Sequence, residues 1–414
     1  MNLLGPYRVL DLTGELGFLT GKIFGDLGAE VIKVEPPDGD PCRRRPPFLR
    51  NGNGSPQGLY WLAYNANKRG ITLNLETSRG RDLFLQMARK VDFICESFPP
   101  GTLEKLGLEY DRLNEENPGL ILVSITPYGQ EGPYRDFLGS DLEIMALSGA
   151  MSLAGEKNGE PMRVSIPQAS MWVGAEAAMG ALTALSYRSL TGMGQHVDVS
   201  AQVAVMSALA HAPAFWDLNH INPDREGVYI TGRSLTGARM RVFWRARDGW
   251  INFILYGGAA GRHTNQQLVA WMEDKGMAQE WLKNIDWDVF AVTSITQEEV
   301  DRIEAPIGEF FLTLSKQEFL AGAVKRQILG YPVATVEDIY TDEQLDGRQF
   351  WQEVKVPDSD LTLRHPGGFA IFNQERLQIS RPAPRIGEHN YDVYEDCLGL
   401  SRSEIEELEA DGVI

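Results

Sequence analysis

Residues 8–35 read RVLDLTGELGFLTGKIFGDLGAEVIKVE, and this stretch decides the fold. Residues 8–12 form a short apolar run that is typical of a buried strand. Apolar side chains then recur on one face of a helix, and Gly28 is the kind of residue that follows a helix end. Residues 29–34 return to an apolar, β-branched pattern. The stretch therefore predicts a strand, a helix and a second strand, the unit from which parallel sheets are built.

The same alternation continues over the first 125 residues. Further strands are predicted at residues 71–75, 91–95 and 120–125, with a helix that opens at Thr77 or Ser78. Strands separated by helices indicate an α/β fold with a parallel, Rossmann-like sheet. In such sheets ligands bind beyond the carboxyl ends of the strands. We therefore expect a site near the residues that follow positions 12, 34, 95 and 125.

The rest of the chain divides into three further regions. Residues 168–190 carry the apolar stripe of a long helix, and residues 196–200 form another strand. Aromatic strands and amphipathic helices from residue 225 to 330 predict a smaller α+β domain. The last segment returns to αβ patterning. We expect a large domain over residues 1–205, a small domain over 225–330, and a segment over 340–414 that rejoins the large domain.

Composition narrows the classes of function. The 414 residues carry 39 Lys and Arg against 57 Asp and Glu, a net charge of −18, so nucleic acid is not an expected partner. Three scattered cysteines argue against a disulfide framework or a zinc site and suit a reducing compartment. The start lacks the pattern of a signal peptide, and the apolar stretch 199–216 is interrupted by polar residues. We expect a soluble, cytoplasmic protein with no membrane partner and no metal.

One dense basic run stands out in this acidic chain. Arg43, Arg44 and Arg45, with Arg50 nearby, follow the second predicted strand. The run can be a solvated loop, or it can be a clamp for a phosphorylated ligand, because guanidinium groups match phosphate oxygens. Its place beyond a strand end favours the clamp. No GxxxxGK[ST] motif is present, and no GxGxxG motif follows the first strand.

The chain resembles the family III CoA-transferases. The matching stretches run in order along the chain: VLDLT at 9–13, LGAEVIKVEPP at 27–37, NKRGITLNL at 67–75, ESFPPG at 96–101, SITPYGQEGPY at 124–134, TGMGQHVDVS at 191–200 and IGEH at 386–389. The resemblance implies a Rossmann-like large domain and a smaller α+β domain, with two chains interlocked as rings. It also implies transfer of coenzyme A from an acyl-CoA to a free carboxylate, with no covalently bound cofactor.

In this family an aspartate attacks the thioester and passes through a mixed anhydride and an aspartyl-CoA thioester. The family pattern is a Gly-x-Pro-x-Arg turn followed by the aspartate near the start of a long helix. Here the turn lies at residues 159–163, and Ser170 occupies the place of the aspartate.

Two roles for Ser170 remain open. A catalytic serine needs a positioned base, and no histidine is near in sequence and no GxSxG surrounds it. A non-catalytic or helix-capping serine is therefore favoured. Glu176 is expected to point away from Ser170 along the helix, and Asp141 matches a family position that looks structural.

The resemblance also implies contacts with coenzyme A, position by position. The matched or neighbouring residues are Leu73, Ser97, Phe98, Lys105, Tyr128 and, from the basic run, Arg44. Gly14, Leu16 and Pro36 stand where the family usually has His, Gln and Arg. These departures, together with the missing nucleophile, suggest a degraded nucleotide site.

The resulting hypothesis is a pseudo-catalytic subunit of a heteromeric family III CoA-transferase. A homologous partner chain would supply the aspartate, and the pair would move coenzyme A from an acyl-CoA such as succinyl-CoA to an organic acid. Two alternatives remain: a homodimeric transferase that uses another carboxylate, and a regulatory protein that binds acyl-CoA. A racemase of the same fold is less favoured, because residues 128–131 contain no histidine.

Overall fold

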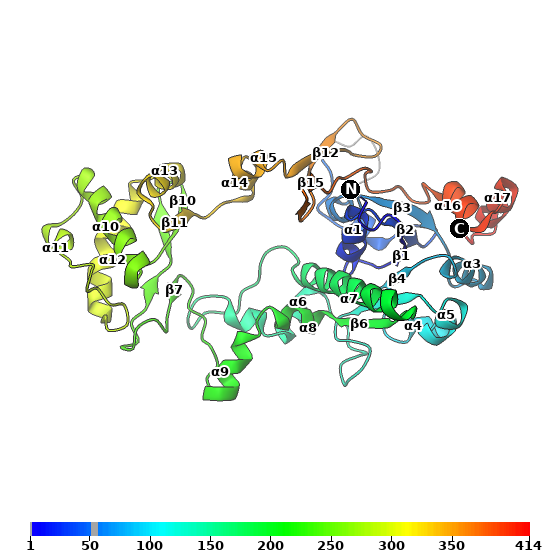
Figure 1. Ribbon diagram of the computed structural model, residues 1–414, viewed down its shortest axis with the longest axis horizontal. Coiled ribbons are helices and arrows are strands. Elements are labelled where there is room, and N and C mark those ends of the chain that lie inside the picture. The colour runs from blue at the N-terminus through cyan, green and yellow to red at the C-terminus, as the bar shows by residue number, and fades with distance from the viewer. Residues whose placement is uncertain (1, 51–56) are drawn as a thin grey trace. The chain divides into compact units, whose positions relative to one another are not determined.

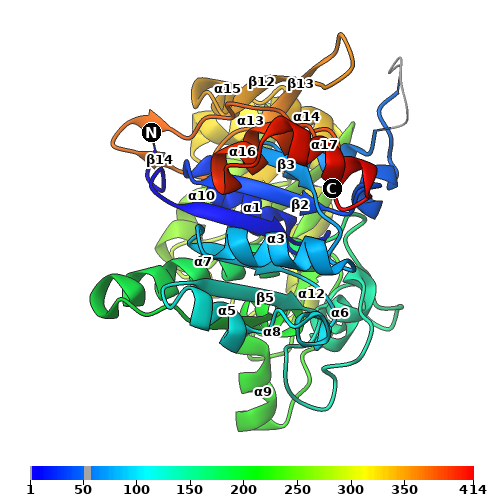
Figure 2. The same ribbon diagram turned by 90° about the vertical axis from the view of Figure 1, so that its right-hand side faces the viewer.

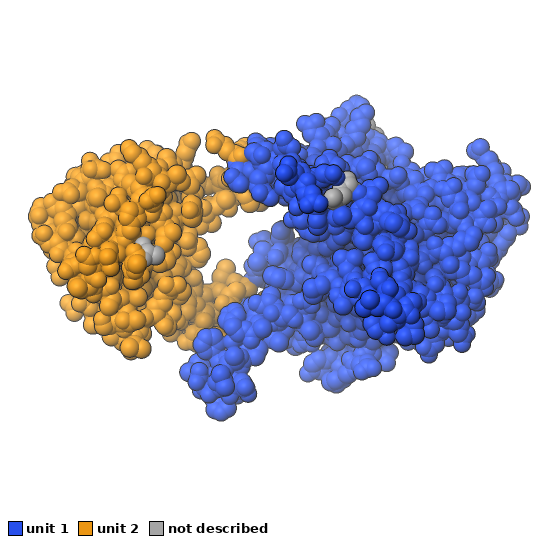
Figure 3. All heavy atoms as spheres, in the orientation of Figure 1, with its two compact units in different colours: residues 1–150, 163–221, 344–414 blue, residues 151–162, 222–343 orange. Residues whose placement is uncertain are grey.

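The computed structural model describes residues 2–50 and 57–414, apart from the side chain of residue 260 (Figure 1). The chain divides into two compact units (Figure 3). Unit 1 comprises residues 1–150, 163–221 and 344–414, and unit 2 comprises residues 151–162 and 222–343.

Unit 1 is built on a six-stranded parallel sheet in the order β3-β2-β1-β4-β5-β6. The strands are β1 (Arg8–Leu12), β2 (Glu30–Glu35), β3 (Lys68–Thr72), β4 (Phe93–Glu96), β5 (Ile121–Thr126) and β6 (His196–Ser200). This confirms the α/β, Rossmann-like fold. The strand order reverses between β1 and β4, where Leu12 pairs with Glu96. Crevices at such a reversal are the usual binding places of open α/β sheets.

Helices cover both faces of this sheet (Figure 2). One face packs against α1 (Phe18–Asp26), α7 (Ala169–Thr191) and α8 (Ala201–Ser207). The other face packs against α3 (Ser78–Ala88), α5 (Tyr110–Glu116), α16 (Asn390–Leu398) and α17 (Arg402–Ala410). Burial of both faces explains why the strands read as nearly continuous apolar runs.

Shorter elements complete unit 1. They are η1 (Pro41–Arg44), α2 (Leu59–Tyr64), α4 (Thr102–Leu106), α6 (Asp141–Leu147), α9 (His211–Asn219), and the two-stranded sheets of β12 (Trp351–Lys355) with β13 (Thr362–Pro366) and β14 (Ile371–Phe372) with β15 (Glu375–Arg376). The chain end returns to this unit, since Val413 and Ile414 are buried in its core.

Unit 2 has an α+β architecture. Its antiparallel sheet has the order β11-β10-β9, formed by β9 (Phe243–Ala246), β10 (Gly249–Phe253) and β11 (Gly330–Pro332). Its helices are α10 (Gly258–Asp274), α11 (Glu280–Lys283), α12 (Gln297–Leu312), α13 (Lys316–Arg326) and α14 (Val336–Tyr340), and β7 (Tyr229–Ile230) pairs with β8 (Met240–Arg241). Phe253, Phe310, Phe311 and Phe319 are fully buried. Aromatic packing thus dominates the core of this unit.

A buried ionic cluster joins Asp11 of β1, Lys33 of β2 and Lys68, the first residue of β3. The Lys68 ammonium group donates to Asp11 Oδ2 at 2.8 Å, to the Phe18 carbonyl at 2.9 Å and to Asn65 Oδ1 at 2.9 Å. The Lys33 ammonium group donates to the Thr13 carbonyl at 2.6 Å and lies 4.0 Å from Asp11 Oδ1. All three charged side chains are buried. Burial alone would raise the pKa of Asp11, but the two ammonium groups more than offset it and lower the pKa.

Two findings bear on the expected absences. Among the described residues, no helix has the length and apolar character needed to cross a membrane. Residues 2–50 and 57–414 also contain no grouping of His, Cys, Asp and Glu that could hold a metal ion.

Removal of the central ammonium group should destabilise unit 1 strongly. Lys68→Met leaves the Asp11 carboxylate buried without its nearest cation, and the loss of one partner from a buried pair costs about 3–5 kcal/mol. Denaturant unfolding at pH 7 measures this change. Arg79→Met provides the control, because its ion pairs with Glu407 and Asp411 are exposed and contribute about 0–1 kcal/mol. Equal losses in the two variants would contradict a special role for the cluster.

Candidate active site

The turns after β1 and β4 meet at the point where the strand order reverses. The backbone N–H of Gly14 donates to Ser97 Oγ at 2.7 Å. Ser97 belongs to the predicted set of nucleotide contacts, and here its hydroxyl ties two strand ends together. A Cβ at position 14 would lie 3.7 Å from Ser97 Oγ, an ordinary contact, so this approach does not depend on a glycine.

Phe98 follows Ser97 in the same turn. Its N–H donates to Glu96 Oε2 at 2.7 Å, and its ring packs against the edge of the core. Glu96 is only 3% exposed. Burial raises the pKa of this carboxyl to about 7, although the Ser124 hydroxyl and the Phe98 N–H act in the opposite direction. A titratable group thus lies directly beneath the turn.

The remaining predicted contacts lie in different environments. The Tyr128 ring is buried and packs against Tyr134 and Phe137. Lys105 is exposed on α4. Leu73 is buried in the core on the side of α3 and α16, so its side chain does not face the strand-end crevice. A ligand could contact Leu73 only through its backbone.

Two residues of the basic run are already engaged by carboxylates. Arg43 donates from Nε and Nη2 to the two oxygens of Glu35, both at 2.6 Å, and its guanidinium lies 3.8 Å from the Trp61 ring. Arg45 pairs with Glu15. Arg44 is exposed and lies 3.8 Å from Asp38. Within the run, Arg44 therefore keeps the most open guanidinium for an incoming phosphate.

Ser170 is the second residue of α7 and is 3% exposed. Its hydroxyl lies 3.1 Å from the Tyr60 hydroxyl. Burial raises the pKa of Tyr60 to about 12, so this phenol stays protonated at neutral pH and cannot serve as a base. No histidine or carboxylate in the described part of the chain hydrogen-bonds to Ser170. The arrangement provides a hydroxyl without the base that a nucleophilic serine needs.

The start of α7 is capped by Asp141. Its Oδ1 accepts from the N–H groups of Gln168 at 2.6 Å and Ala169 at 2.8 Å. A helix-capping role for Ser170 is wrong, because Ser170 lies inside the helix as its second residue, the N-cap is Gln168, and the Ser170 hydroxyl contacts Tyr60. The two bonds to Asp141 agree with a structural role for that residue.

Sequence reasoning did not identify two residues near Ser170, Tyr60 and Glu15. Tyr60 lies in the aromatic run of α2, which reads as an ordinary core helix, and Glu15 lies in the turn after β1. The Arg45 guanidinium, paired with Glu15, lies 5.4 Å from the Tyr60 ring centroid. The sequence signal that could have identified Glu15 was its position in the turn after the first strand.

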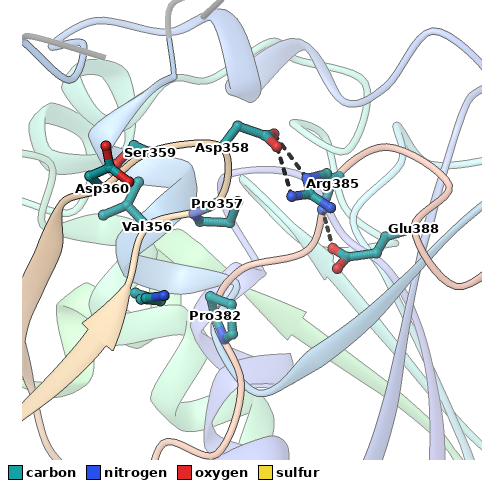
Figure 4. Close-up of a pocket in the computed structure, with 9 residues that line it drawn as sticks. Val356, Pro357, Asp358, Ser359, Asp360, Pro382, Arg385 and Glu388 are labelled. Atoms are coloured by element: carbon teal, nitrogen blue, oxygen red, sulfur yellow. Dashed lines mark hydrogen bonds and ion pairs between the residues drawn. The ribbon is translucent and has the colours of Figure 1, made fainter. Parts of the chain in front are cut away.

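A separate cavity of about 430 Å³ lies between residues 355–360 and 382–388 (Figure 4). The Arg385 guanidinium is held by Asp358 at 2.9 and 2.7 Å, and the Arg385 N–H donates to Glu388 at 2.8 Å. Asp360 adds a further negative charge. This lining is unfavourable for an anionic ligand, so the strand-end crevice is the better candidate.

Comparison with known proteins assigns the chain. The model of CoA-transferase family III matches residues 4–390. The succinyl-CoA:(R)-benzylsuccinate CoA-transferase subunit BbsE of Thauera aromatica is 36% identical over 97% of this chain and 96% of its own length. The succinate–glutarate CoA-transferase of Agrobacterium fabrum is 28% identical over 97% of both chains. The sequence had predicted a likeness to the aspartate-lacking subunit of a succinyl-CoA:benzylsuccinate CoA-transferase, and the likeness to that enzyme is confirmed.

Solved structures agree with the sequence matches. A CAIB/BAIF family protein from Brucella suis superimposes with a TM-score of 0.80 at 27% identity, covering 96% of this chain and 100% of the other. On both counts, the chain belongs to CoA-transferase family III.

Proposed function

We propose that this chain is the non-catalytic subunit of a heteromeric family III CoA-transferase, in which a homologous partner chain supplies the nucleophilic aspartate. The observation that carries this proposal is the environment of Ser170. The position is intact at the start of α7, yet it offers a hydroxyl hydrogen-bonded to a protonated tyrosine.

The chemistry explains why the hydroxyl is a poor substitute. A carboxylate that attacks a thioester gives a mixed anhydride and releases the CoA thiolate. The thiolate then attacks the aspartyl carbonyl of the anhydride, which releases the donor carboxylate and leaves an aspartyl-CoA thioester. The aspartyl carbonyl stays activated in both species. A serine would form an ordinary ester, from which a thioester could be regenerated only uphill. A site of this kind therefore needs a carboxylate from another chain.

The surface of unit 1 supports a protein partner. Trp172, Met179 and Leu190 on α7 are 46%, 63% and 86% exposed. An apolar groove of about 920 Å³ lies beside this helix, lined by residues of α1, α2, α7 and 365–369. Large exposed apolar surfaces of this type usually mark contacts with other chains. The interlocked arrangement expected for the family would cover them.

The proposed role in the reaction is to complete one wall of the nucleotide site. Ser97, Phe98, Lys105, Arg44 and Tyr128 are the candidate contacts for coenzyme A, with Leu73 limited to its backbone. Succinyl-CoA is the proposed donor, because it is named for the Thauera relative and for further relatives. The proposed acceptor is an organic acid such as benzylsuccinate in anaerobic toluene breakdown, by likeness to that relative. Free cysteines at positions 42, 95 and 397 support a cytoplasmic location.

Expression with and without the homologous partner tests this role. The chain alone should not transfer coenzyme A from succinyl-CoA, whereas the pair should be active. In the pair, Ser170→Ala should leave kcat within about twofold, and loss of the partner's aspartate should lower kcat by on the order of 10³-fold or more. Rates are measured by chromatography of the CoA thioesters. Activity of the lone chain that is abolished by Ser170→Ala would overturn the proposal.

The exposed face of α7 should be required for assembly. Met179→Glu places a charge on that apolar face and should weaken association with the partner at least about tenfold, because a buried unpaired charge is costly. Leu361→Glu, on an exposed leucine away from α7, is the matched control. Light scattering after size-exclusion chromatography measures both. Normal assembly of Met179→Glu would contradict a partner surface at this helix.

A further inference from the structure

Two side chains on the edge strand β6 contact neighbouring parts of the chain, one a turn and the other a residue of strand β5. Asp198 Oδ2 accepts from the Gln130 N–H at 2.9 Å, in the turn that begins at Tyr128. His196 Nε2 lies 2.9 Å from Ser124 Oγ on β5. Both side chains lie on one face of the strand, because they are two residues apart. They come from the stretch TGMGQHVDVS, to which the proposed function gives no role.

The contact of His196 continues to the turn after β4. Glu96 pairs in register with Ser124, and Ser124 pairs with Asp198, so the three residues form one row across β4, β5 and β6. The Ser124 hydroxyl lies beside the Glu96 carboxyl in this row and acts to lower its pKa, and Glu96 accepts from the Phe98 N–H at 2.7 Å. The row thus connects His196 to the turn after β4.

The surroundings keep this chain of hydrogen bonds sensitive to proton binding. Burial raises the pKa of Glu96, and the negative charges of Glu104 on α4 and Asp198 on β6 raise it further. Burial lowers the pKa of His196. The negative charges of Asp198 on its own strand, Glu104 on α4 and Asp111 on α5 act in the opposite direction but do not offset the burial. The Tyr110 ring stacks on the imidazole with a centroid distance of 5.5 Å. Glu96 and His196 are therefore both shifted toward their neutral forms.

We propose that His196 and Asp198 are positioning residues for the nucleotide wall: Asp198 fixes the Tyr128–Gln130 turn directly, and His196 fixes the Ser97–Phe98 turn through Ser124 and Glu96. This inference rests on the proposed function, because the two turns matter as contacts for coenzyme A. One edge strand thereby sets the separation of two turns on neighbouring strands. Neither His196 nor Asp198 needs to touch the ligand.

Calorimetry with coenzyme A on the full chain, together with its partner where the two co-purify, tests the link to binding. Glu96→Leu removes the acceptor for the Phe98 N–H and should raise the Kd at least tenfold at pH 8. Glu96→Gln keeps a neutral acceptor oxygen, as protonated Glu96 does, and should raise the Kd only about threefold at pH 8. His196→Ala and Asp198→Ala should each weaken binding about threefold or more, and Asp198→Asn should recover it. Glu115→Gln, an exposed carboxylate on α5 that acts on neither Glu96 nor His196, is the control and should stay within twofold.

The dependence on pH separates positioning from a merely structural role. Protonation of Glu96 weakens it as an acceptor, so wild-type affinity should fall as the pH drops from 8 to 6, and the fall should be smaller in Glu96→Gln. Titration of coenzyme A affects the two pH profiles equally, so the comparison of the wild type with Glu96→Gln removes its contribution. Equal pH profiles, or wild-type affinity in Glu96→Leu, would overturn the inference.

A second measurement does not depend on coenzyme A. In amide NMR spectra of the full chain without ligand, the Phe98 N–H should shift with a midpoint near pH 7, and Glu96→Gln should abolish the shift. A flat Phe98 signal between pH 6 and 8 would also overturn the inference. If the wild type binds no coenzyme A but the Phe98 signal titrates, the proposed nucleotide wall fails and the hydrogen-bonded row stands.

Discussion

The buried contact between Lys68 and Asp11 is the constraint on which the rest of unit 1 depends. Asp11 lies on the central strand β1, and its carboxylate also accepts from the N–H and the hydroxyl of Thr13, at the point where β1 becomes a turn. Lys68, from β3, also donates to the carbonyl of Phe18, the first residue of α1, and to Asn65 at the end of α2. One charged group thus determines how the chain leaves the sheet toward Gly14, Glu15 and the helix that packs on α7. Charges buried this deeply persist only when every donor and acceptor has a partner.

The elements around Ser170 are held together by direct contacts. The turn after β1 contacts the turn after β4 through Ser97, and α1 contacts α7 through a bond from Thr20 to the Gly174 carbonyl. Near Ser170, the Tyr60 hydroxyl faces the serine and Arg45 pairs with Glu15. A ligand with several negative charges gains less from arginines that already have carboxylate partners.

The sequence predicted the strands of the sheet but not all of their bounds, since the third strand was expected at residues 71–75 and lies at 68–72. It did not predict the details of the site. Apolar runs separated by helical periodicity predict parallel strands, because both faces of such a sheet are covered. The family motifs located Ser170, since its spacing from the turn at 159–163 is local. The pairing of Arg43 with Glu35, Arg45 with Glu15, and Tyr60 with Ser170 joins side chains that no local pattern connects. Leu73 was proposed as a contact from its motif, but the alternation along the strand sends its side chain into the core.

The cap on α7 separates the start of the helix from the side chain at position 170. Asp141 accepts from the N–H groups of Gln168 and Ala169, so the Ser170 hydroxyl has no part in starting the helix. Another small polar residue at this position would leave that cap in place. Under the proposed function, the residue at position 170 can therefore differ between related chains while the scaffold of unit 1 stays the same.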